Sequence, residues 1–355
     1  MEMEPKFDQL KTFIVEKGWS PYRFKQILQA VFKERIDRFE RMKALPLSLR
    51  KQLQQAFGES ILSLKPVTRL SSAQADKVLF ELPDHNKIET VRMIYRAGWE
   101  SYCISSQCGC GFGCKFCATG TIGMKRNLSA DEITDQILYF YLHKHPIDSI
   151  SFMGMGEALA NPQTFVALKT LTDPQLFNLS PRRITVSTIG IIPQMRRLSQ
   201  EFPQVNITFS LHSPFDEQRS ELMPINRKYP LQQALALLDE HIQKHRRKVY
   251  IAYVMLPGVN DTPDHAEALI SLLQGRGSWD YLYQVNLIRY NPAVGTPEAY
   301  NRPQKRELDS FYERLKEAGL NVTVRQSFGV DIDAACGQLY GQYYIRGKPK
   351  EVEEK

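Results

Sequence analysis

Residues 101–123 read "SYCISSQCGCGFGCKFCATGTIG", a strand-like apolar run that leads directly into a glycine-rich loop. Within this loop Cys110, Cys114 and Cys117 follow the spacing C-x3-C-x2-C. The glycines between them leave the backbone free to bend, so three thiolates can converge. Soft thiolate ligands in this number predict a metal or cluster site rather than a set of buried packing residues.

The number of ligands separates two kinds of metal site. A structural zinc ion usually has four ligands, often supplied as two C-x2-C pairs. Here only Cys114 and Cys117 have the C-x2-C spacing, and no pair of histidines follows at the zinc-finger spacing. Three thiolates suit a cubane iron–sulfur cluster in which one iron stays open for a substrate. We therefore expect an iron–sulfur cluster on Cys110, Cys114 and Cys117.

The chain that follows the strand and its loop alternates strand-like and helix-like segments. Apolar runs of strand length alternate with amphipathic stretches such as 129–144 and 231–244. Successive βα units predict a parallel sheet of the barrel type, with the functional residues at the carboxyl ends of the strands. The six predicted strands are 101–107, 149–157, 183–190, 205–212, 249–256 and 282–291.

Two further segments precede the barrel pattern. Ser20 and Pro21 predict the start of a helix that runs to about Glu34, and a second amphipathic stretch ends at Gly58. From 61 to 96 the pattern changes to period two, which predicts two or three antiparallel strands. We therefore expect an α/β protein: a partial (βα)6 barrel with a small helical N-terminal domain and a short antiparallel β bridge. The expected domains are a helical accessory RNA-binding domain at 1–60, the β bridge at 61–97, the barrel at 98–300, a C-terminal extension at 301–345 and a charged tail at 346–355.

The composition describes a folded chain with a surplus of basic residues. Of its 355 residues 43% are hydrophobic and 24% are charged, which excludes a disordered or collagen-like protein. Lys and Arg number 46 against 39 Asp and Glu, and the net charge of +7 favours a polyanionic partner such as nucleic acid. No apolar run has the length of a membrane span, and the N-terminus "MEMEPKFDQL" lacks the pattern of a signal peptide. We expect a cytoplasmic protein without a membrane partner, in a compartment where thiols stay reduced.

The cysteine spacing resembles that of the radical S-adenosylmethionine (SAM) enzymes, in which an aromatic residue, here Phe116, precedes the last cysteine. In those enzymes an acidic glycine-rich segment after the second strand holds the amino group of SAM, and "GMGE" at 154–157 stands at the corresponding place. The resemblance implies a 4Fe–4S cluster and SAM as cofactors. It also implies SAM contacts at successive strand ends, from Gly156, Glu157, Ser187, Ser210, Leu211, His212 and Asn291.

A closer resemblance covers nearly the whole chain. The motifs "CISSQCGC", "SFMGMGEALAN", "STIGIIP", "FSLHSP" and "DIDAACGQL" together are similar to those of the RNA adenine methyltransferases of the RlmN and Cfr type. Cys108 and the phrase "GWESYCISSQCGC" are similar to the Cfr branch, which implies methylation of carbon 8 of an adenine in 23S rRNA and resistance to antibiotics of the peptidyl transferase centre. The RlmN branch implies carbon 2 of the same adenine, with tRNA as a possible second substrate. A noncatalytic, metal-stabilised RNA-binding module is the alternative from another class, supported by the basic charge and the cysteine loop.

The resemblance also implies a mechanism and its residues. Two SAM molecules are used: one methylates Cys336 in "DAACGQL", and the other is cleaved at the cluster to a radical that removes hydrogen from this methyl group. The resulting methylene radical adds to the adenine and links protein to RNA. Cys103 then resolves the link by forming a disulfide with Cys336, and Glu89 in "ETV" matches the proton acceptor of the family. Cys108 receives no role.

Two partners follow from the same resemblance. The target adenine is buried in the mature ribosomal subunit, so we expect naked or partly assembled 23S rRNA as the substrate. This agrees with the way proteins read RNA, which is mostly through bases splayed from single-stranded regions. The cluster also needs an electron donor, such as a flavodoxin system.

The first prediction concerns the cluster ligands. Replacing Cys110, Cys114 or Cys117 by Ala is expected to abolish SAM cleavage, because two thiolates do not hold a cubane with one defined open iron. The Cys108→Ala variant is expected to keep the cluster. Iron content and the visible absorption of anaerobically reconstituted protein measure both outcomes. A requirement for Cys108 with Cys110 dispensable would show that the ligands are misassigned.

Overall fold

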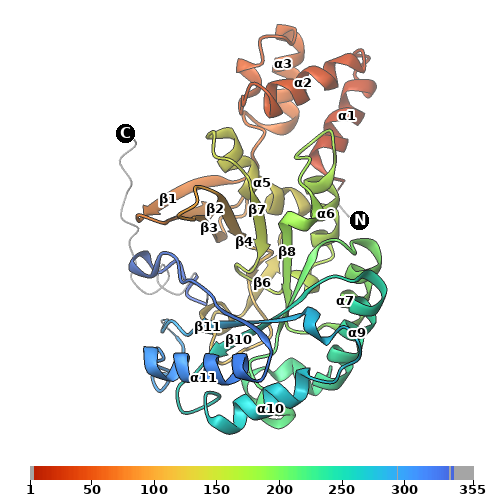
Figure 1. Ribbon diagram of the computed structural model, residues 1–355. Coiled ribbons are helices and arrows are strands. Elements are labelled where there is room, and N and C mark those ends of the chain that lie inside the picture. Colours follow the sequence, from red (N-terminus) through yellow and green to blue (C-terminus); the bar gives the residue numbers. More distant parts are fainter. Residues whose placement is uncertain (1–3, 294, 336, 340–355) are drawn as a thin grey trace.

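The computed structural model of the chain describes residues 4–293, 295–335 and 337–339 (Figure 1). Its centre is a ten-stranded sheet with the strand order β1-β2-β3-β4-β7-β8-β9-β10-β11-β12. The sheet is open in the described residues, with β1 and β12 at its two edges. The strands are β1(Lys65–Ser71), β2(Ala75–Glu81), β3(Lys87–Ile94), β4(Glu100–Ile104), β7(Ser149–Phe152), β8(Ile184–Thr188), β9(Asn206–Ser210), β10(Val249–Met255), β11(Tyr283–Arg289) and β12(Asn321–Val324).

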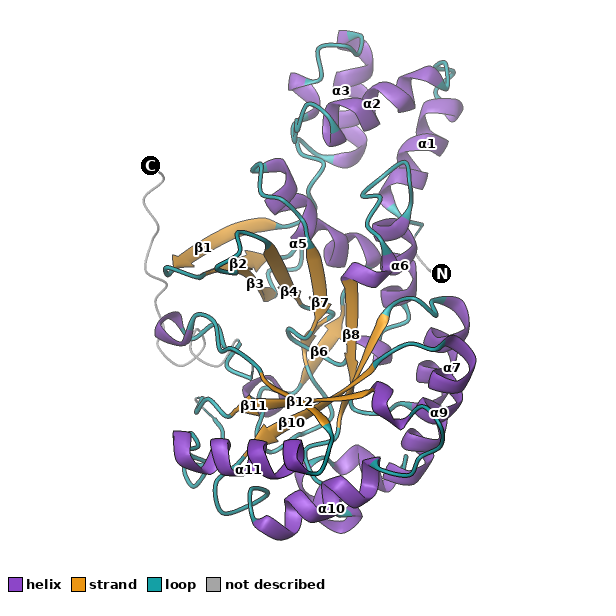
Figure 2. Cartoon of the chain, in the orientation of Figure 1, coloured by secondary structure: helices purple, strands orange, loops and turns teal. Residues whose placement is uncertain are grey.

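The part of the sheet from β4 to β12 is parallel throughout and forms the partial barrel. All six strands that the sequence predicts are present and adjacent in chain order, so the predicted α/β fold is confirmed, and the parallel strands are consistent with a partial barrel. A seventh parallel strand, β12, was not predicted; its four residues fall where the sequence analysis expects only an extension. The main helices lie outside the curved sheet (Figure 2). They are α5(Ala130–Leu142), α6(Gln163–Thr172), α7(Ile192–Glu201), α9(Leu231–His245), α10(Pro263–Leu273) and α11(Lys305–Glu317).

Three antiparallel strands extend the sheet beyond β4. β1 pairs with β2, β2 with β3, and β3 with β4, as the period-two pattern predicts. In this register Val91 of β3 lies opposite Cys103 of β4, and Cys103 lies opposite Ser151 of β7. β4 is therefore shared between the antiparallel strands and the barrel. The functional consequence is that side chains of β3 lie next to the barrel interior.

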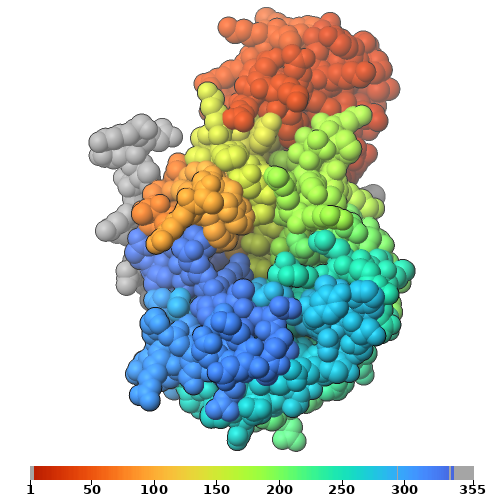
Figure 3. Space-filling model, viewed as in Figure 1, coloured from red at the N-terminus to blue at the C-terminus, as the bar shows by residue number. Residues whose placement is uncertain are grey.

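The N-terminal helices α1(Lys6–Glu16), α2(Tyr22–Phe32) and α3(Leu47–Phe57) gather into a module that projects from one end of the barrel (Figure 3). The module has a hydrophobic core of its own, which is completed by Leu138 and Leu142 of α5. The Lys6 ammonium also forms a buried ion pair with the Asp135 carboxylate of α5. Because apolar and charged groups of α5 are covered by these helices, the module is part of the folded barrel rather than a detachable arm.

Short elements complete the described chain. A separate hairpin of β5(Gln107–Gly109) and β6(Met124–Asn127) carries the cysteine loop, followed by the single turn α4(Ala118–Thr121). α8(Asp216–Leu222) follows β9, and the 3-10 turns are η1(Phe39–Arg41), η2(Ala158–Ala160), η3(Pro181–Arg183), η4(Pro224–Arg227), η5(Asp280–Leu282) and η6(Val330–Ile332). None of the helices in the described residues combines the length and the apolar character that crossing a membrane requires.

Candidate active site

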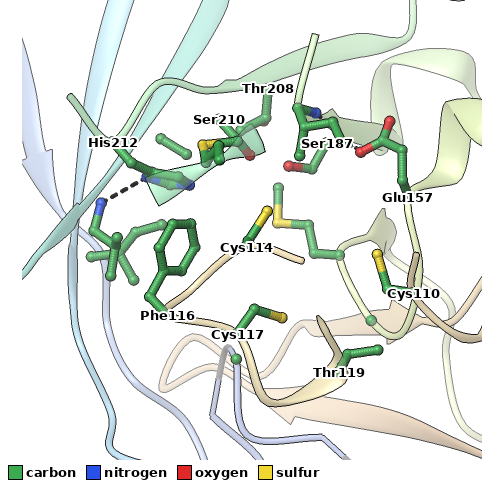
Figure 4. A pocket seen from close by; sticks show the side chains of 18 of the residues that line it. Cys110, Cys114, Phe116, Cys117, Thr119, Glu157, Ser187, Thr208, Ser210 and His212 are labelled. Atoms are coloured by element: carbon green, nitrogen blue, oxygen red, sulfur yellow. Dashed lines mark hydrogen bonds between the residues drawn. The ribbon is translucent and has the colours of Figure 1, made fainter. Parts of the chain in front are cut away.

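A pocket lies at the carboxyl ends of the barrel strands (Figure 4). It brings together residues from β7, β8, β9 and the cysteine loop, which are far apart in the sequence. This is the place where barrel proteins carry their functional groups. Of the residues predicted to bind cluster or cofactor, those that line it are Cys110, Cys114, Cys117, Gly156, Glu157, Ser187, Ser210 and His212.

The cysteine loop is closed by backbone contacts of the β5–β6 hairpin. The Cys110 amide donates to the Gly123 carbonyl at 3.0 Å, and the Cys117 amide donates to the Cys114 carbonyl at 3.2 Å. Gly109 has φ +76°, and a Cβ at this position would stand 1.9 Å from the Gly123 carbonyl oxygen. Only glycine allows the two strands of the hairpin to approach here. The loop geometry that presents the thiols therefore requires glycine at position 109.

The three thiols surround one end of the pocket, as Figure 4 shows. Burial raises the pKa of the Cys110 thiol to about 11, and burial with the neighbouring thiols holds the pKa of the Cys114 thiol well above its ordinary range. Ionised thiolates here therefore need a compensating positive charge, which bound iron supplies. No three His, Cys, Asp or Glu side chains of the described residues converge as ligands of a single metal ion. A 4Fe–4S cluster does not require such convergence, because each thiolate binds a different iron.

Cys108 lies outside this group. Its side chain is buried in the main hydrophobic core and does not line the pocket. Burial raises the pKa of its thiol to about 12, so it is a small packing residue rather than a ligand. Its position on β5, facing away from the pocket lining, explains why a fourth cysteine in the loop adds no fourth ligand.

Glu157 is the acidic group of the pocket, and it stands at the carboxyl end of β7. Its carboxylate accepts hydrogen bonds from the Ile189 amide at 3.0 Å and the Leu159 amide at 3.3 Å. Burial nevertheless raises the pKa of Glu157 to about 7. A cationic group entering the pocket would favour its ionised form, so the site suits an ammonium.

Gly156 fixes the approach of this segment to β5. It has φ +94°, and a Cβ there would stand 2.4 Å from the Cβ of Gln107. The Gln107 side-chain oxygen accepts from the Glu157 amide at 2.8 Å. The loop can therefore carry Glu157 into the pocket only if the preceding residue has no side chain.

Polar side chains of β8 and β9 form the opposite wall. Ser187 and Ser210 line the pocket, and His212 follows them with φ +59°. The His212 Nδ1 accepts from the Val254 amide at 3.0 Å, and burial lowers the pKa of its imidazole to about 3. A neutral ring that accepts at Nδ1 carries its proton on Nε2, which leaves a donor for a ligand. Leu211 differs from the expectation, because its side chain lies in the core and its backbone amide already donates to the Ala252 carbonyl.

Arg219 of α8 is a residue that the sequence analysis missed. Its guanidinium is fully buried and donates to the carbonyls of Ile189 and Ser210, both at 2.9 Å, and to that of Leu211 at 3.1 Å. It thereby ties together the ends of the strands that carry the pocket serines. Burial lowers the pKa of Arg219 to about 10, so it keeps its charge at neutral pH. The segment "DEQRSEL" has the composition of an exposed helix, and it gives no signal of this role.

A second cavity adjoins the first and shares Met153 and Arg325 with it. Cys103 and Asn291 line this second cavity rather than the first. The Asn291 amide nitrogen donates to the Arg289 carbonyl at 3.1 Å, but its side-chain oxygen is buried and has no hydrogen-bond partner in the described part of the chain. A buried acceptor without a donor is costly, so it marks a place for a ligand that donates.

Described residues near the C-terminus line both cavities. Ala335 lines the second cavity and Gly337 lines the first. The predicted methyl carrier, Cys336, lies outside the described residues. No disulfide links two of the described cysteines, so the expected bond between Cys103 and Cys336 is not tested.

Glu89, the predicted proton acceptor, lies on β3 with a completely buried side chain. It shares a face of the strand with Val91, which lines the second cavity. Its carboxylate oxygen lies 3.4 Å from the ammonium of Lys77 on β2. Glu89 itself lines neither of the two cavities; it lies two residues before Val91 on the same strand face.

Two family models match separate parts of the chain. The radical SAM superfamily matches residues 104–273, which include the cysteine loop and most of the barrel. The N-terminal domain of the ribosomal RNA large subunit methyltransferases matches residues 3–58, which form the helical module. Both parts of the chain thus have known counterparts.

Relatives of similar length match nearly the whole chain. The "Ribosomal RNA large subunit methyltransferase Cfr" of Staphylococcus aureus is 58% identical over 95% of this chain and 97% of the relative. The protein of the same name in Shouchella clausii is 60% identical over 96% of this chain and 97% of the relative. Among solved structures, a radical SAM methyltransferase from Sphaerobacter thermophilus is 35% identical, with a TM-score of 0.87 over 95% of this chain and 98% of that chain.

The geometry of Gly156 generates a second prediction. The Gly156→Ala variant is expected to bind SAM about tenfold or more weakly, because strain and overpacking each cost about 1–3 kcal/mol and displace Glu157. Equilibrium dialysis with the reconstituted protein measures the affinity. Gly319→Ala is the matched control, since Gly319 has φ +86° and no atom within 4 Å of a built Cβ. If both variants lost the same affinity for SAM, the contact between position 156 and Gln107 would not be the cause of the loss.

Proposed function

Because the chain belongs to the radical SAM superfamily and, within it, to the Cfr-type ribosomal RNA large subunit methyltransferases, we propose that it methylates carbon 8 of an adenine in 23S rRNA. Such a modification at the peptidyl transferase centre confers resistance to antibiotics that bind there. The observation that carries the proposal is the pair of adjoining cavities, one lined by three cysteine thiols and Glu157 and the other by Cys103.

The cofactors of this superfamily are a 4Fe–4S cluster and SAM. Cys110, Cys114 and Cys117 would hold the cluster, and Glu157 would bind the ammonium of SAM. When bound, these groups supply one-electron chemistry, which removes the need for a nucleophilic ring carbon. The neutral His212 ring and the Ser187 and Ser210 side chains offer hydrogen bonds to the remaining polar groups of SAM.

Two cysteines of the chain carry the methyl group and release the product. In the proposed scheme Cys336 bears the methyl carbon and becomes linked through it to the adenine. The Cys103 thiolate then attacks the Cys336 sulfur: the S–S bond forms, the C–S bond breaks, and its electron pair passes to the released carbon, which takes up a proton. The reductant that the cluster also needs restores the two thiols. Cys103 lies in the same cavity as Ala335, next to Cys336 in the chain, which supports this pairing.

The ring carbon must also lose its own hydrogen. We assign this proton to Glu89, which is buried beside the second cavity. The C–H bond breaks, the proton passes to a carboxylate oxygen, and the electron pair returns to the ring. The one electron that the radical adduct then holds in excess would be accepted by the cluster on Cys110, Cys114 and Cys117, which supplies one electron for SAM cleavage. A positioned carboxylate of this kind accelerates proton transfer by about 100-fold to 10,000-fold.

The RNA partner is proposed to be protein-free or partly assembled 23S rRNA, whose target base can be turned out of its surroundings. The helical module carries exposed basic side chains that suit the phosphate backbone. They include Lys11, Lys17, Lys25, Lys33, Arg38, Arg41, Lys43 and Lys51. A flavodoxin system is proposed as the electron donor, and the cytoplasm as the compartment.

The nucleoside product tests the proposed function. Anaerobic turnover with 23S rRNA, SAM and a reductant is expected to give 8-methyladenosine, identified by mass spectrometry of digested RNA against both methyl isomers. A product methylated at carbon 2 would replace the proposal by the RlmN activity. Reaction of assembled large subunits at the rate of protein-free RNA would overturn the proposed substrate.

The two-cysteine scheme makes a separate prediction. Cys103→Ala is expected to stop the reaction with RNA still attached to the protein, because no second thiol attacks the Cys336 sulfur. Denaturing electrophoresis of labelled RNA detects the adduct, and peptide mapping locates it. Cys336→Ala is the control and should form neither adduct nor product, since no carbon is carried. Release of methylated RNA by Cys103→Ala at the parental rate would contradict the scheme.

A further inference from the structure

A buried ion pair lies on the antiparallel strands next to the second cavity. The side chains of Lys77 and Glu89 are 3% and 0% exposed, and the Lys77 Nζ lies 3.4 Å from the Glu89 Oε1. Lys77 of β2 is directly opposite Val91 of β3, so Lys77 and Glu89 are diagonal neighbours on one face of this strand pair. Val91 on the same face lines the cavity that contains Cys103. The ion pair is therefore built into the wall behind this cavity.

The same ammonium contacts the segment that leads to Cys336. The Lys77 Nζ donates to the Asp333 carbonyl at 3.0 Å. Asp333 ends the turn η6 in a left-handed conformation with φ +51°. In Figure 1 this blue segment lies beside the orange strands β1–β3, as the hydrogen bond requires. One side chain thus connects the Glu89 carboxylate with the backbone just before Cys336.

We propose that Lys77 is a positioning residue of the methyl transfer, whose ammonium, held by the Asp333 carbonyl, keeps the Glu89 carboxylate ionised. The inference rests on the proposed function, in which Glu89 accepts the proton of the adenine carbon. It assigns to β2, which contributes no residue to the SAM pocket, a direct part in the later half of the reaction.

The physical reason is the cost of a charge in the protein interior. A buried carboxylate without a compensating cation is expensive, and it avoids this cost by binding a proton. A protonated Glu89 has no site left for the proton of the ring carbon. Loss of the ammonium should therefore stop the reaction after the methyl carbon has been attached to the adenine, and not before.

Lys77→Met tests the inference, because it keeps the length of the side chain and removes the charge. Methylation of Cys336 and SAM cleavage are expected at the parental rate, measured by peptide mass spectrometry and by chromatography of the SAM products. The rate at which methylated RNA forms is expected to fall at least about 100-fold, because this is the lower end of the range by which a general base accelerates a reaction. The protein–RNA adduct should accumulate on denaturing gels. Lys77→Arg keeps the cation and should recover most of the product.

Three control variants distinguish a positioning role of Lys77 from a general effect on the stability of the fold. Glu89→Gln should show the same pattern as Lys77→Met. The double variant should lose no more than either single variant, because the two side chains act as one unit. It leaves neither charge of the pair in the interior, so it reports on the reaction even if Lys77→Met fails to fold. Lys6→Met breaks a second buried lysine pair, with Asp135, and should lower stability without adduct accumulation.

Two outcomes overturn the inference. One is methylated RNA from Lys77→Met at the parental rate. The other is a joint loss of Cys336 methylation and product in folded Lys77→Met or in the double variant, which would show a purely structural role. The assay measures the amounts of protein–RNA adduct and of methylated RNA, whichever ring carbon carries the methyl group. The test therefore remains valid if the product is methylated at carbon 2. If the parent protein methylates no RNA, the proposed function fails together with the inference.

Discussion

The pairing of β4 on both of its edges is the constraint on which the site depends. One edge joins the parallel barrel through β7, and the other joins the antiparallel strands through β3. Parallel strands bring their carboxyl ends to one rim, where the cysteine loop and Glu157 meet. The antiparallel extension adds a second wall at the side of that rim, which the barrel strands alone do not provide. Cys103 lies on the shared strand and therefore belongs to both parts of the architecture.

The two cavities differ in the polar groups that line them, and each set of groups suits a different ligand. The first cavity contains thiols, a buried carboxylate and a neutral imidazole, which suits a cofactor that carries an ammonium and several hydrogen-bonding groups. The second contains Cys103 and an asparagine oxygen without a partner in the described chain. They adjoin at Met153 and Arg325, and the Arg325 guanidinium donates to the Met153 sulfur at 2.8 Å.

Buried ionic groups hold this arrangement in place. Arg219 joins the ends of β8 and β9 through backbone carbonyls, and Lys77 joins β2 to the segment before Cys336. Lys6 joins the helical module to α5. Charges in the interior are retained only where they are paired or hydrogen-bonded, and each of these three is. They fix relative positions of elements more than they add to net stability, because their desolvation offsets much of their attraction.

Local pattern in the sequence determined the six barrel strands, the antiparallel extension, helices α2 and α3 and the spacing of the three thiols, because periodicity and ligand spacing are properties of neighbouring residues. It did not distinguish α1 as a separate helix. The motif resemblance identified the pocket residues, and all of these except Leu211 and Asn291 line the first cavity. Only the tertiary structure decided the rest. β12 is too short to be distinguished by periodicity, the helix of Arg219 reads as exposed, and the contact of Lys77 with Glu89 and Asp333 spans strands and a segment distant in the chain. Such contacts depend on which strand faces the sheet brings together. They cannot be read from the order of residues along the chain, because strand pairing and register decide them.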